Sequence, residues 1–321
     1  MCTAISMGCY FGRTLDYGYS YTEEVTLTPR NFPLSFRHAG ILPSHHAMLG
    51  MAYVADGYPL YYDAVNEKGL AGAGLNFTES ADYHKEEKGR DNVAQFELIP
   101  WVLGQCASVT EAEHLLKNTV ITPEVFRQDL PCAKLHWIFA DRERAITVES
   151  LKDGFHILPN PVGVLTNEPP FPQQLYRLRD FMGLSPKAPE NRFAPALNLT
   201  PYSRGMGAMG LPGDLSSSSR FIRTAFTLQN SHYEDSEISG ISQFFHVLNT
   251  AAQTRGCCVL EDGSCEITIY TSCMDVTRGI YYYTTYENQR ITAVDLHKEN
   301  PDGVSLIRYA LKDRQDIFRQ N

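Results

Sequence analysis

Cysteine is the second residue of this 321-residue chain. Removal of Met1 would leave Cys2 with both its thiol and a free α-amine, so that one residue supplies a nucleophile and a base. A free α-amine titrates at about 7.7–8.0 and a thiol at about 8.5, so a proton can pass from sulfur to nitrogen close to neutral pH. Thiolate is the attacking form of cysteine. Taken alone this signal is weak, because an isolated cysteine is usually structural, and other residues of the chain change that balance.

Arg13 and Asp16 are candidates to assist Cys2, because they fall on the strand that we expect to pair with the strand beginning at Cys2. A guanidinium beside the sulfur would stabilise the thiolate. A carboxylate would accept a hydrogen bond from the α-ammonium and orient it. A surface salt bridge is the alternative interpretation, and the nearby cysteine favours the catalytic one.

Asn76 and Asn167 each stand at the end of a predicted strand, where an amide can donate to a developing oxyanion. Asparagine in a turn is the commoner role for either residue taken alone. Arg220 follows four serines at the start of a predicted helix, where it faces either the site or solvent. Together with Cys2, these residues predict nucleophilic attack on an acyl carbon.

The elements that must hold these side chains alternate between groups of strands and groups of helices. Turn residues separate the strands, and the helices carry apolar side chains at helical spacing. This order favours antiparallel sheets with segregated helices over a βαβ series. No linker or repeat divides the chain, so residues 1–321 are predicted to form one domain. Strands are predicted at residues 2–7, 9–16, 24–28, 47–55, 61–66, 69–77, 136–140, 145–150, 155–158, 162–165, 266–270, 279–285 and 290–295, and helices at 93–104, 110–118, 171–183, 217–228 and 241–252.

Three local details accompany this assignment. Pro100 is expected to kink or end the helix at residues 93–104. Ser108 or Thr110 is expected to cap the next helix, with Glu113 completing a capping box. Residues 186–214 are predicted to form a long loop rich in Pro and Gly, and loops of this length are uncommon unless they serve a site.

Composition excludes several classes of protein. A formal net charge of −9 and a pI near 5.6 argue against a nucleic-acid binder, because phosphate recognition needs clustered Lys and Arg. No apolar run has the length of a membrane helix, and the first residues do not resemble a signal peptide, so a cytoplasmic protein is expected. The eight cysteines lack metal-binding spacing. Apart from Cys2 they are expected to be reduced, small and buried, with Cys257 and Cys258 in a strand.

Motifs spread over nearly the whole chain resemble those of one family, the choloylglycine hydrolases, which contains the bile salt hydrolases and the penicillin V acylases. The resemblance implies an α+β fold of the N-terminal nucleophile (Ntn) hydrolase type. This fold is a four-layer αββα sandwich, in which two antiparallel sheets lie between helical layers. The motifs occupy residues 1–3, 11–16, 66–70, 73–77, 163–167, 211–214, 219–221 and 270–273.

The resemblance also implies a role for each candidate residue. Cys2 matches the nucleophile, with its α-amine as general base, and Arg13 and Asp16 match the residues that stabilise the thiolate and orient the amine. Asn76 and Asn167 match the oxyanion hole, through the main-chain N–H of the first and the side-chain amide of the second. No metal or cofactor is implied. Asparagine at position 76, where penicillin V acylases more often have tyrosine, favours conjugated bile salts.

By the same resemblance, Arg220 is a further polar residue of the active site, and an apolar pocket holds the steroid body of the substrate. Arg204 is expected to pair with the carboxylate of a glycine conjugate or the sulfonate of a taurine conjugate. The alternative for the pocket positions is ordinary core packing, and the alternative for Arg204 is a solvated loop arginine. The positions that match the pocket lining are Leu15, Phe126, Leu130 and Leu135.

The predicted function is therefore hydrolysis of glycine- or taurine-conjugated bile salts to free bile acid and amino acid. The resemblance implies a cytoplasmic homotetramer, while the acidic composition and the lack of a long apolar run argue against nucleic acid or a membrane as a partner. Two alternatives remain open from the sequence. One is an acylase acting on penicillin V, N-acyl amino acids or acylated lactones by the same mechanism, and the other is a catalytically silent protein that binds lipophilic molecules.

Overall fold

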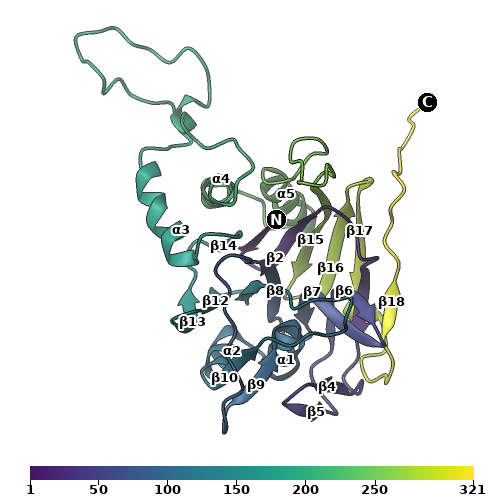
Figure 1. The fold of residues 1–321 in the computed structure, drawn as a ribbon. Helices are drawn as coiled ribbons and strands as arrows, with labels where there is room; N and C mark the ends of the chain where they lie inside the picture. Colours follow the sequence, from purple (N-terminus) through teal and green to yellow (C-terminus); the bar gives the residue numbers. More distant parts are fainter.

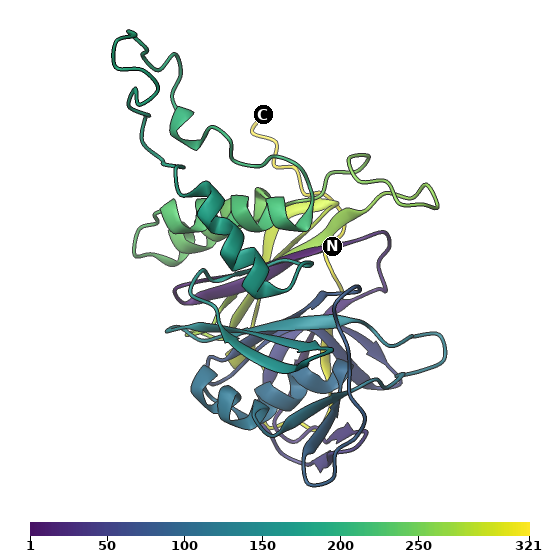
Figure 2. The ribbon, with the colours of Figure 1, turned by 60° about the vertical axis from the view of Figure 1, so that its left-hand side comes forward.

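The computed structural model describes residues 1–321 and contains two large antiparallel sheets packed face to face (Figure 1, Figure 2). In spatial order, the six-stranded sheet consists of β14 (Val164–Leu165), β1 (Cys2–Met7), β2 (Tyr10–Tyr17), β15 (Ile267–Asp275), β16 (Ile280–Thr285) and β17 (Asn288–Asp295). The eight-stranded sheet consists of β13 (Gly154–Pro159), β12 (Ala145–Leu151), β11 (Leu135–Ala140), β8 (Ala71–Asn76), β7 (Tyr58–Asn66), β6 (Met48–Ala55), β3 (Glu24–Thr28) and β18 (Ile307–Tyr309).

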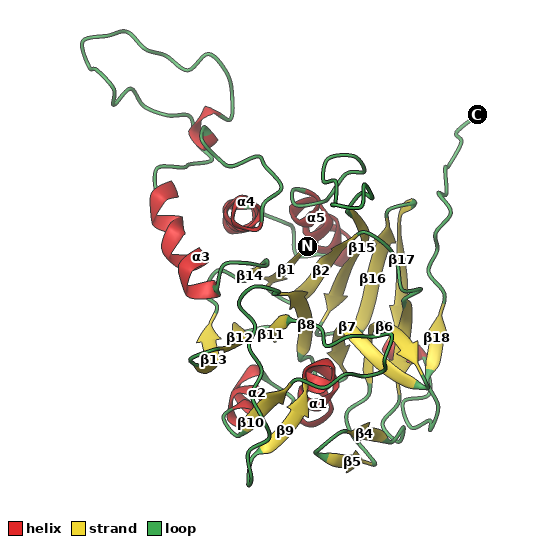
Figure 3. Ribbon diagram, in the orientation of Figure 1, coloured by secondary structure: helices red, strands yellow, loops and turns green.

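Helices cover the outer face of each sheet (Figure 3). Helices α4 (Ser217–Asn230) and α5 (Glu237–Asn249) contact the six-stranded sheet, with α3 (Phe171–Arg177) beside them. Helix α1 (Leu98–Gln105) contacts the eight-stranded sheet, and α2 (Val109–Leu116) packs against α1. The predicted αββα sandwich is therefore confirmed.

Two clusters of buried apolar side chains hold the four layers together. The larger cluster contains 39 buried residues and extends from the space between the sheets to α4 and α5. The smaller contains 25 buried residues and lies between the eight-stranded sheet and helices α1 and α2. Burial of apolar surface on this scale is the main driving force for the sandwich. Both β1 and β2 are almost wholly buried, which places the residues of the predicted site deep in the fold.

The region predicted as a helix at residues 93–104 is different in the structure. Residues Asp91–Ala94 form strand β9, which pairs in parallel with β10 (Thr119–Thr122), and a 3₁₀ turn, η1 (Gln95–Glu97), leads into α1. Pro100 lies in the first turn of α1, where a main-chain N–H has no partner within the helix. The proline is therefore accommodated at the start of a helix, and the prediction that it ends one is wrong.

Ser108 is the N-cap of α2, as one of the two predicted alternatives, and its hydroxyl accepts a hydrogen bond from the Glu111 N–H. The acidic partner differs from the prediction. Glu111 accepts a hydrogen bond from Ala107 N at 2.8 Å, whereas Glu113 forms an ion pair with Arg144. The predicted residue lies two positions too far along the helix to reach its N-terminus.

All eight cysteines are free thiols, but fewer of them are buried than predicted. Only Cys2, Cys106 and Cys273 are buried, and Cys257 is exposed. Residues 257 and 258 lie in a loop and not in a strand, because residues 254–265 leave α5 and turn back before β15 begins.

The predicted helix at residues 171–183 is shorter, since α3 continues only as a 3₁₀ turn, η2 (Leu178–Phe181). The predicted loop at residues 186–214 is confirmed, with one 3₁₀ turn, η3 (Met206–Ala208), and it projects from the sandwich (Figure 1). The remaining short elements are β4 (Leu34–Phe36), β5 (Gly40–Leu42) and η4 (Leu296–Lys298). None of the helices combines the length and the apolar character that crossing a bilayer requires.

Candidate active site

The β1–β2 hairpin brings the first candidate residues together. Its register pairs Cys2 with Leu15, Thr3 with Thr14, and Ala4 with Arg13. Side chains alternate between the faces of a strand, and paired residues share a face. Cys2 and Arg13 therefore lie on the face that meets the eight-stranded sheet. Thr14 and Asp16 lie on the opposite face, toward the helices. This arrangement confirms the predicted strand pairing.

Strand β14 brings Asn167 to the other side of Cys2. Its register pairs Leu165 with Ala4, so the antiparallel pairing extended by two residues places Asn167 opposite Cys2. Asn167 Oδ1 accepts a hydrogen bond from Cys2 N at 2.9 Å. Asn167 Nδ2 donates to the Asn76 carbonyl at 2.8 Å. One side chain thus joins the end of β8 in one sheet to the start of β1 in the other.

The main chain of Asn76 is turned toward Asn167. The next residue, Phe77, donates from its N–H to the carbonyl of Lys134 in the ladder with β11. Antiparallel pairs alternate, so the N–H and C=O of Asn76 point away from β11. Pairing of β8 with β7 ends at Ala73, which leaves this edge of Asn76 open to the site. The Asn76 N–H therefore lies on the same side as the carbonyl that Asn167 binds.

Arg13 is a buried cation with one free donor. Its guanidinium donates to the carbonyls of Thr14 at 3.0 Å, Gly74 at 2.5 Å and Tyr62 at 3.3 Å. Its Nη2 has no hydrogen-bond partner although it is buried. Burial disfavours the charged guanidinium, but Cys2 and then Tyr270, Asp63 and Asp16 favour it more, so the pKa of Arg13 lies above its ordinary value. Cys2 is the largest of these favourable influences, and the register of the hairpin puts Cys2 and Arg13 on the same face of the sheet.

Asp63, on β7, is a fully buried carboxyl behind Arg13 that the sequence did not single out. The hydroxyls of Tyr270 and Tyr281 each donate to it at 2.6 Å, and these residues belong to the other sheet. Burial raises the pKa of Asp63, while Arg13 and the two tyrosine hydroxyls oppose that rise. Asp63 thus bridges the two sheets. Alternation of apolar and polar residues does not reveal this, because β7 is buried on both faces from Asp63 to Asn66.

The carboxylate of Asp16 is held by two hydroxyls. Thr268 donates to it at 2.6 Å and Thr14 at 3.1 Å. Met1 extends β1 by one residue: its α-ammonium donates to the main-chain oxygen of Asp16 at 2.6 Å and pairs with the carboxylate of Glu266. Glu266 is a second acidic residue near the N-terminus that sequence reasoning missed, because it lies 264 positions from Cys2 and comes near it only through the β2–β15 pairing.

Arg220 faces the site and not solvent. Ser216 caps the helix α4, and Arg220 follows in its first turn with its side chain fully buried. Its guanidinium donates at 2.6 Å to each of three oxygens: the Cys2 carbonyl, Thr3 Oγ1 and Asn167 Oδ1. Burial lowers the pKa of Arg220, and Asp16 and Cys2 partly offset this. Because Oδ1 of Asn167 accepts from Arg220, its Nδ2 must be directed to Asn76.

The loop that carries Asn167 is fixed at several points. Ser217 Oγ accepts from Asn167 N, and Gln174 Nε2 donates to the Asn167 carbonyl at 2.8 Å. The carboxylate of Glu168 accepts hydrogen bonds from Ser80 and its neighbour Glu79 in the loop after β8. The loops that follow β8 and β14 are therefore joined directly beside Asn76 and Asn167.

An apolar cavity of about 410 Å³ opens beside this cluster. Gly74 and Asn76 belong both to its wall and to the cluster, while Cys2 itself is 3% exposed and is not part of the wall. Five side chains of its wall are tyrosines that the sequence analysis did not select, namely Tyr17, Tyr21, Tyr53, Tyr61 and Tyr62. They lie on β2, β6, β7 and the segment after β2, so only the folded sheets bring them together.

Three of the four predicted pocket positions, Phe126, Leu130 and Leu135, line this cavity. Phe126 is held in place by Arg37, whose guanidinium lies 5.5 Å from its ring centre and donates to its carbonyl at 2.8 Å. The structure does not place Leu15 in the wall. Leu15 shares the face of Cys2 and Arg13 and belongs to the core between the sheets, which agrees with the alternative of core packing.

The structure does not bring Arg204 to the site. It is exposed on the projecting loop that precedes α4 and makes no hydrogen bond or ion pair with its side chain. The arginine that does reach Asn167 is Arg220, because α4 begins against β1. Pairing of Arg204 with a substrate anion is therefore without support from this geometry.

Comparison with known proteins agrees with this architecture. A sequence model of linear amide C–N hydrolases of the choloylglycine hydrolase type matches residues 2–309. The chain belongs to the choloylglycine hydrolase family. It is 48% identical, over the full length of both chains, to a protein of Lactiplantibacillus plantarum named bile salt hydrolase/transferase. A protein of the same name from Clostridium perfringens is 37% identical over the full length of both chains.

Solved structures show the same fold. The structure of the C2A mutant of the conjugated bile acid hydrolase from Clostridium perfringens matches over the full length of both chains, with a TM-score of 0.92 and 35% identity. Penicillin V acylase from Agrobacterium tumefaciens matches 96% of this chain and 90% of its own, with a TM-score of 0.77 and 18% identity. The second likeness concerns the fold alone. Membership of the choloylglycine hydrolase family makes the chain a hydrolase of linear amides.

Proposed function

We propose that this enzyme hydrolyses the amide bond of glycine- or taurine-conjugated bile salts to free bile acid and amino acid. The observation that carries the proposal is the junction at Cys2. Arg13, Asn76 and Asn167 converge there from both sheets. Gly74, which binds Arg13, and Asn76 also form part of the wall of an apolar cavity. Relatives named bile salt hydrolases, matched over the full length, support the same substrate class.

The first step we propose is loss of Met1. In the full chain Cys2 N belongs to a peptide bond, and it donates to Asn167 Oδ1. Once it is an amine, the same nitrogen gains a lone pair with which it can take the proton of the thiol. Asp16 is proposed to orient this amine, with its carboxylate already fixed by Thr14 and Thr268.

The thiolate then attacks the amide carbon of the substrate. The free Nη2 of Arg13 supports a role in stabilising the thiolate, because it is a buried donor without another partner. For the oxyanion we propose two donors, the main-chain N–H of Asn76 and Nδ2 of Asn167. Preorganised donors of this kind stabilise the developing charge without rearrangement. Arg220 is proposed to hold Asn167 in the required orientation through Oδ1.

Collapse of the tetrahedral intermediate breaks the C–N bond, and the α-ammonium of Cys2 gives its proton to the departing amino nitrogen. Water then attacks the thioester carbon and passes a proton to the same amine. Breakage of the C–S bond releases the acid and restores the thiolate. The apolar cavity is proposed to hold the steroid body, with Phe126, Leu130 and Leu135 in contact with it. A rigid apolar body beside a polar reacting end suits such a cavity.

Comparison of substrates on the purified enzyme tests this proposal. We expect faster release of glycine or taurine from conjugated cholate than of 6-aminopenicillanic acid from penicillin V. Faster cleavage of penicillin V would overturn the substrate assignment and leave the amide hydrolase mechanism in place. Cys2→Ser is expected to abolish turnover of every substrate. Bile-salt binding without any turnover by the wild type would instead favour a silent lipophile-binding protein.

Assembly and location are part of the same proposal. We propose one domain, because a single core cluster includes side chains from both sheets and from α4 and α5. A homotetramer is proposed from family resemblance, and the exposed Phe193 and Tyr202 on the projecting loop, 87% and 83% exposed, offer apolar surface for contact between copies. A cytoplasmic location is proposed for a chain whose thiols are all free. Size-exclusion chromatography with light scattering and cell fractionation test these two statements.

A further inference from the structure

A second cavity, which we call the acidic cavity, lies beside the loop that joins β2 to β3 and has a volume of about 430 Å³. The end of β2 and this loop contribute to both cavities. Tyr17 and Tyr21 line the apolar cavity, whereas Tyr19 and Glu23 line the acidic one. Strands β15 and β16 and the C-terminal segment after β18 complete its wall. Nothing in the proposed mechanism uses this cavity.

The wall of the acidic cavity contains carboxylates but no lysine, arginine or histidine. Two of these carboxylates are neutralised from outside the wall: Glu24 pairs with Arg308 at 2.6 Å and Glu287 pairs with Arg255 at 2.8 Å. Glu23 has no basic partner. A cavity with this charge disfavours anions, so a bile salt or its amino-acid product does not suit it. The four carboxylates belong to Glu23, Glu24, Glu287 and Asp313.

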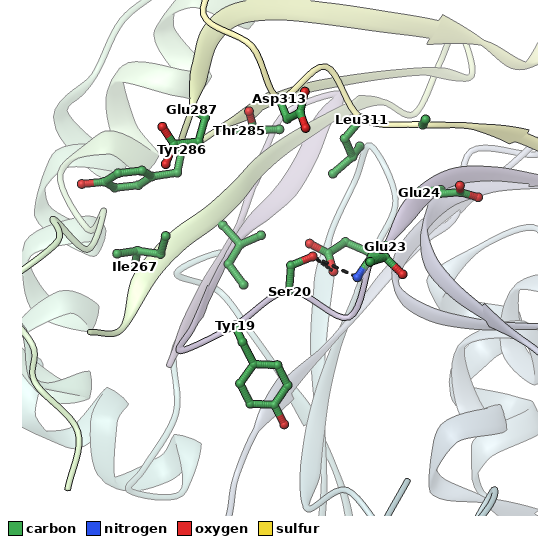
Figure 4. Close-up of a pocket in the computed structure, with 13 residues that line it drawn as sticks. Tyr19, Ser20, Glu23, Glu24, Ile267, Thr285, Tyr286, Glu287, Leu311 and Asp313 are labelled. Carbon is green, nitrogen blue, oxygen red and sulfur yellow. Dashed lines mark hydrogen bonds between the residues drawn. The ribbon is translucent and has the colours of Figure 1, made fainter. Parts of the chain in front are cut away.

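Glu23 is the feature that points to a ligand. It is only 3% exposed, and one of its oxygens, Oε2, accepts hydrogen bonds from Ser20 Oγ at 3.0 Å and Tyr21 N at 3.1 Å. The other oxygen, Oε1, is buried without any hydrogen-bond partner. Figure 4 shows Glu23 beside Ser20, with Ile267 and Leu311 on other sides of the same cavity. A buried carboxylate oxygen that lacks a donor is unfavourable, and a ligand that supplies a charged donor relieves this cost.

We propose that the acidic cavity binds an organic cation, namely a primary ammonium group carried on a short apolar body. The ammonium donates to the carboxylate of Glu23, and the body packs against Ile267, Ile269 and Leu311. A metal ion suits the cavity less well, because no group of three or more metal-binding side chains comes together in the structure.

Titration calorimetry on the full-length enzyme tests this site, with n-hexylamine as the probe and n-hexanol as its uncharged match. Wild type is expected to bind hexylammonium at least about tenfold more tightly than hexanol, since a hydrogen bond between charged groups is among the stronger ones. Glu23→Gln is expected to weaken amine binding by about tenfold or more and to leave hexanol binding unchanged. Cys2→Ala is expected to bind the amine like wild type, which separates this result from any failure of the catalytic proposal.

The matched control is Glu287→Gln, which removes a carboxylate of the same wall that already pairs with Arg255. It is expected to change amine affinity by less than about twofold, because exposed pairs of this kind contribute little. Ala310→Trp fills the cavity from its exposed side and provides a second test if Glu23→Gln does not fold. Absence of amine binding by wild type, or equal affinity of wild type with both Glu23→Gln and Ala310→Trp, would overturn the proposal.

Discussion

Asn167→Asp changes one atom at the junction of the proposed site, and the structure predicts a large loss of activity from it. Asn167 Oδ1 accepts from Cys2 N and Arg220, and both bonds survive with a carboxylate oxygen. Nδ2, which lies 2.8 Å from the Asn76 carbonyl, becomes an oxygen and can no longer donate. The substitution therefore preserves shape and the contact with Arg220, and it removes one proposed oxyanion donor.

Two effects determine the size of this loss. Removing one donor of an oxyanion hole lowers kcat by about 10²–10³, which corresponds to about 2.7–4 kcal/mol of transition-state stabilisation. A negative oxygen facing a carbonyl oxygen is also repulsive, and a carboxylate beside the α-amine favours retention of a proton by the base. The repulsion and the retained proton both lower kcat further. We therefore expect kcat for glycocholate hydrolysis to fall by at least about 10².

The assay is steady-state release of glycine, accompanied by urea denaturation of each variant. Asn160→Asp is the matched control, because Asn160 is also buried and its Nδ2 donates to a carbonyl, that of Val164 at 2.9 Å, away from Cys2. We expect this control to lose stability while its kcat stays within about threefold of wild type, as expected for a group that stabilises no transition state. A kcat for Asn167→Asp close to that of wild type would refute the assignment of Nδ2 to the oxyanion hole.

Three further substitutions follow from the same geometry. Arg220 donates to four oxygens, including the Leu215 carbonyl, whereas the ammonium of Arg220→Lys has three donors, so at least one acceptor loses its partner. We expect the free energy of unfolding to fall by about 1–3 kcal/mol per lost bond in urea titrations, and an unchanged value would contradict the bridging role of Arg220. Burial raises the pKa of Glu97 to about 7, so the folded state binds a proton more tightly than the unfolded state, and stability is lost as pH rises from about 4.5 to about 7. Glu97→Gln should remove this pH-dependent loss of unfolding free energy, which totals about 3 kcal/mol, and a loss equal to that of wild type in denaturation at several pH values would disprove the cause. Phe126→Ala removes an aromatic wall of the apolar cavity and is expected to raise KM for conjugated bile salts by about tenfold with little change in kcat, whereas an unchanged KM would place the steroid elsewhere.

The part of the site that lies close along the chain could be predicted from the sequence. Strands were predicted at residues 2–7 and 9–16 on either side of Gly8, and they form the β1–β2 hairpin, so placing Arg13 near Cys2 needed no knowledge of distant residues. Asn76 and Asn167 were selected as strand ends, and their meeting depends on the stacking of two sheets. The family resemblance supplied that information, since spacing alone does not.

Residues that reach the site only through long-range pairing were not predictable. Asp63, Glu266 and Thr268 lie on strands or loops whose neighbours are set by the order of strands in each sheet. The prediction for Pro100 was wrong because a proline is compatible with two positions, the end of a helix and its first turn. Proline within an apolar helical pattern predicts the end of a helix, but the first turn of α1, where Pro100 lies, is equally favourable for the proline ring.

Intact-mass spectrometry of the purified protein, before and during incubation with glycocholate, tests the central claim most directly. The claim is that the amino group and sulfur of a processed Cys2 act together on the substrate carbonyl. We predict that the protein has lost one methionine and that acid quenching traps a second species heavier by one cholyl group, bound as a thioester and absent in Cys2→Ser. Active protein that retains Met1, or turnover that persists in Cys2→Ser, would contradict the account.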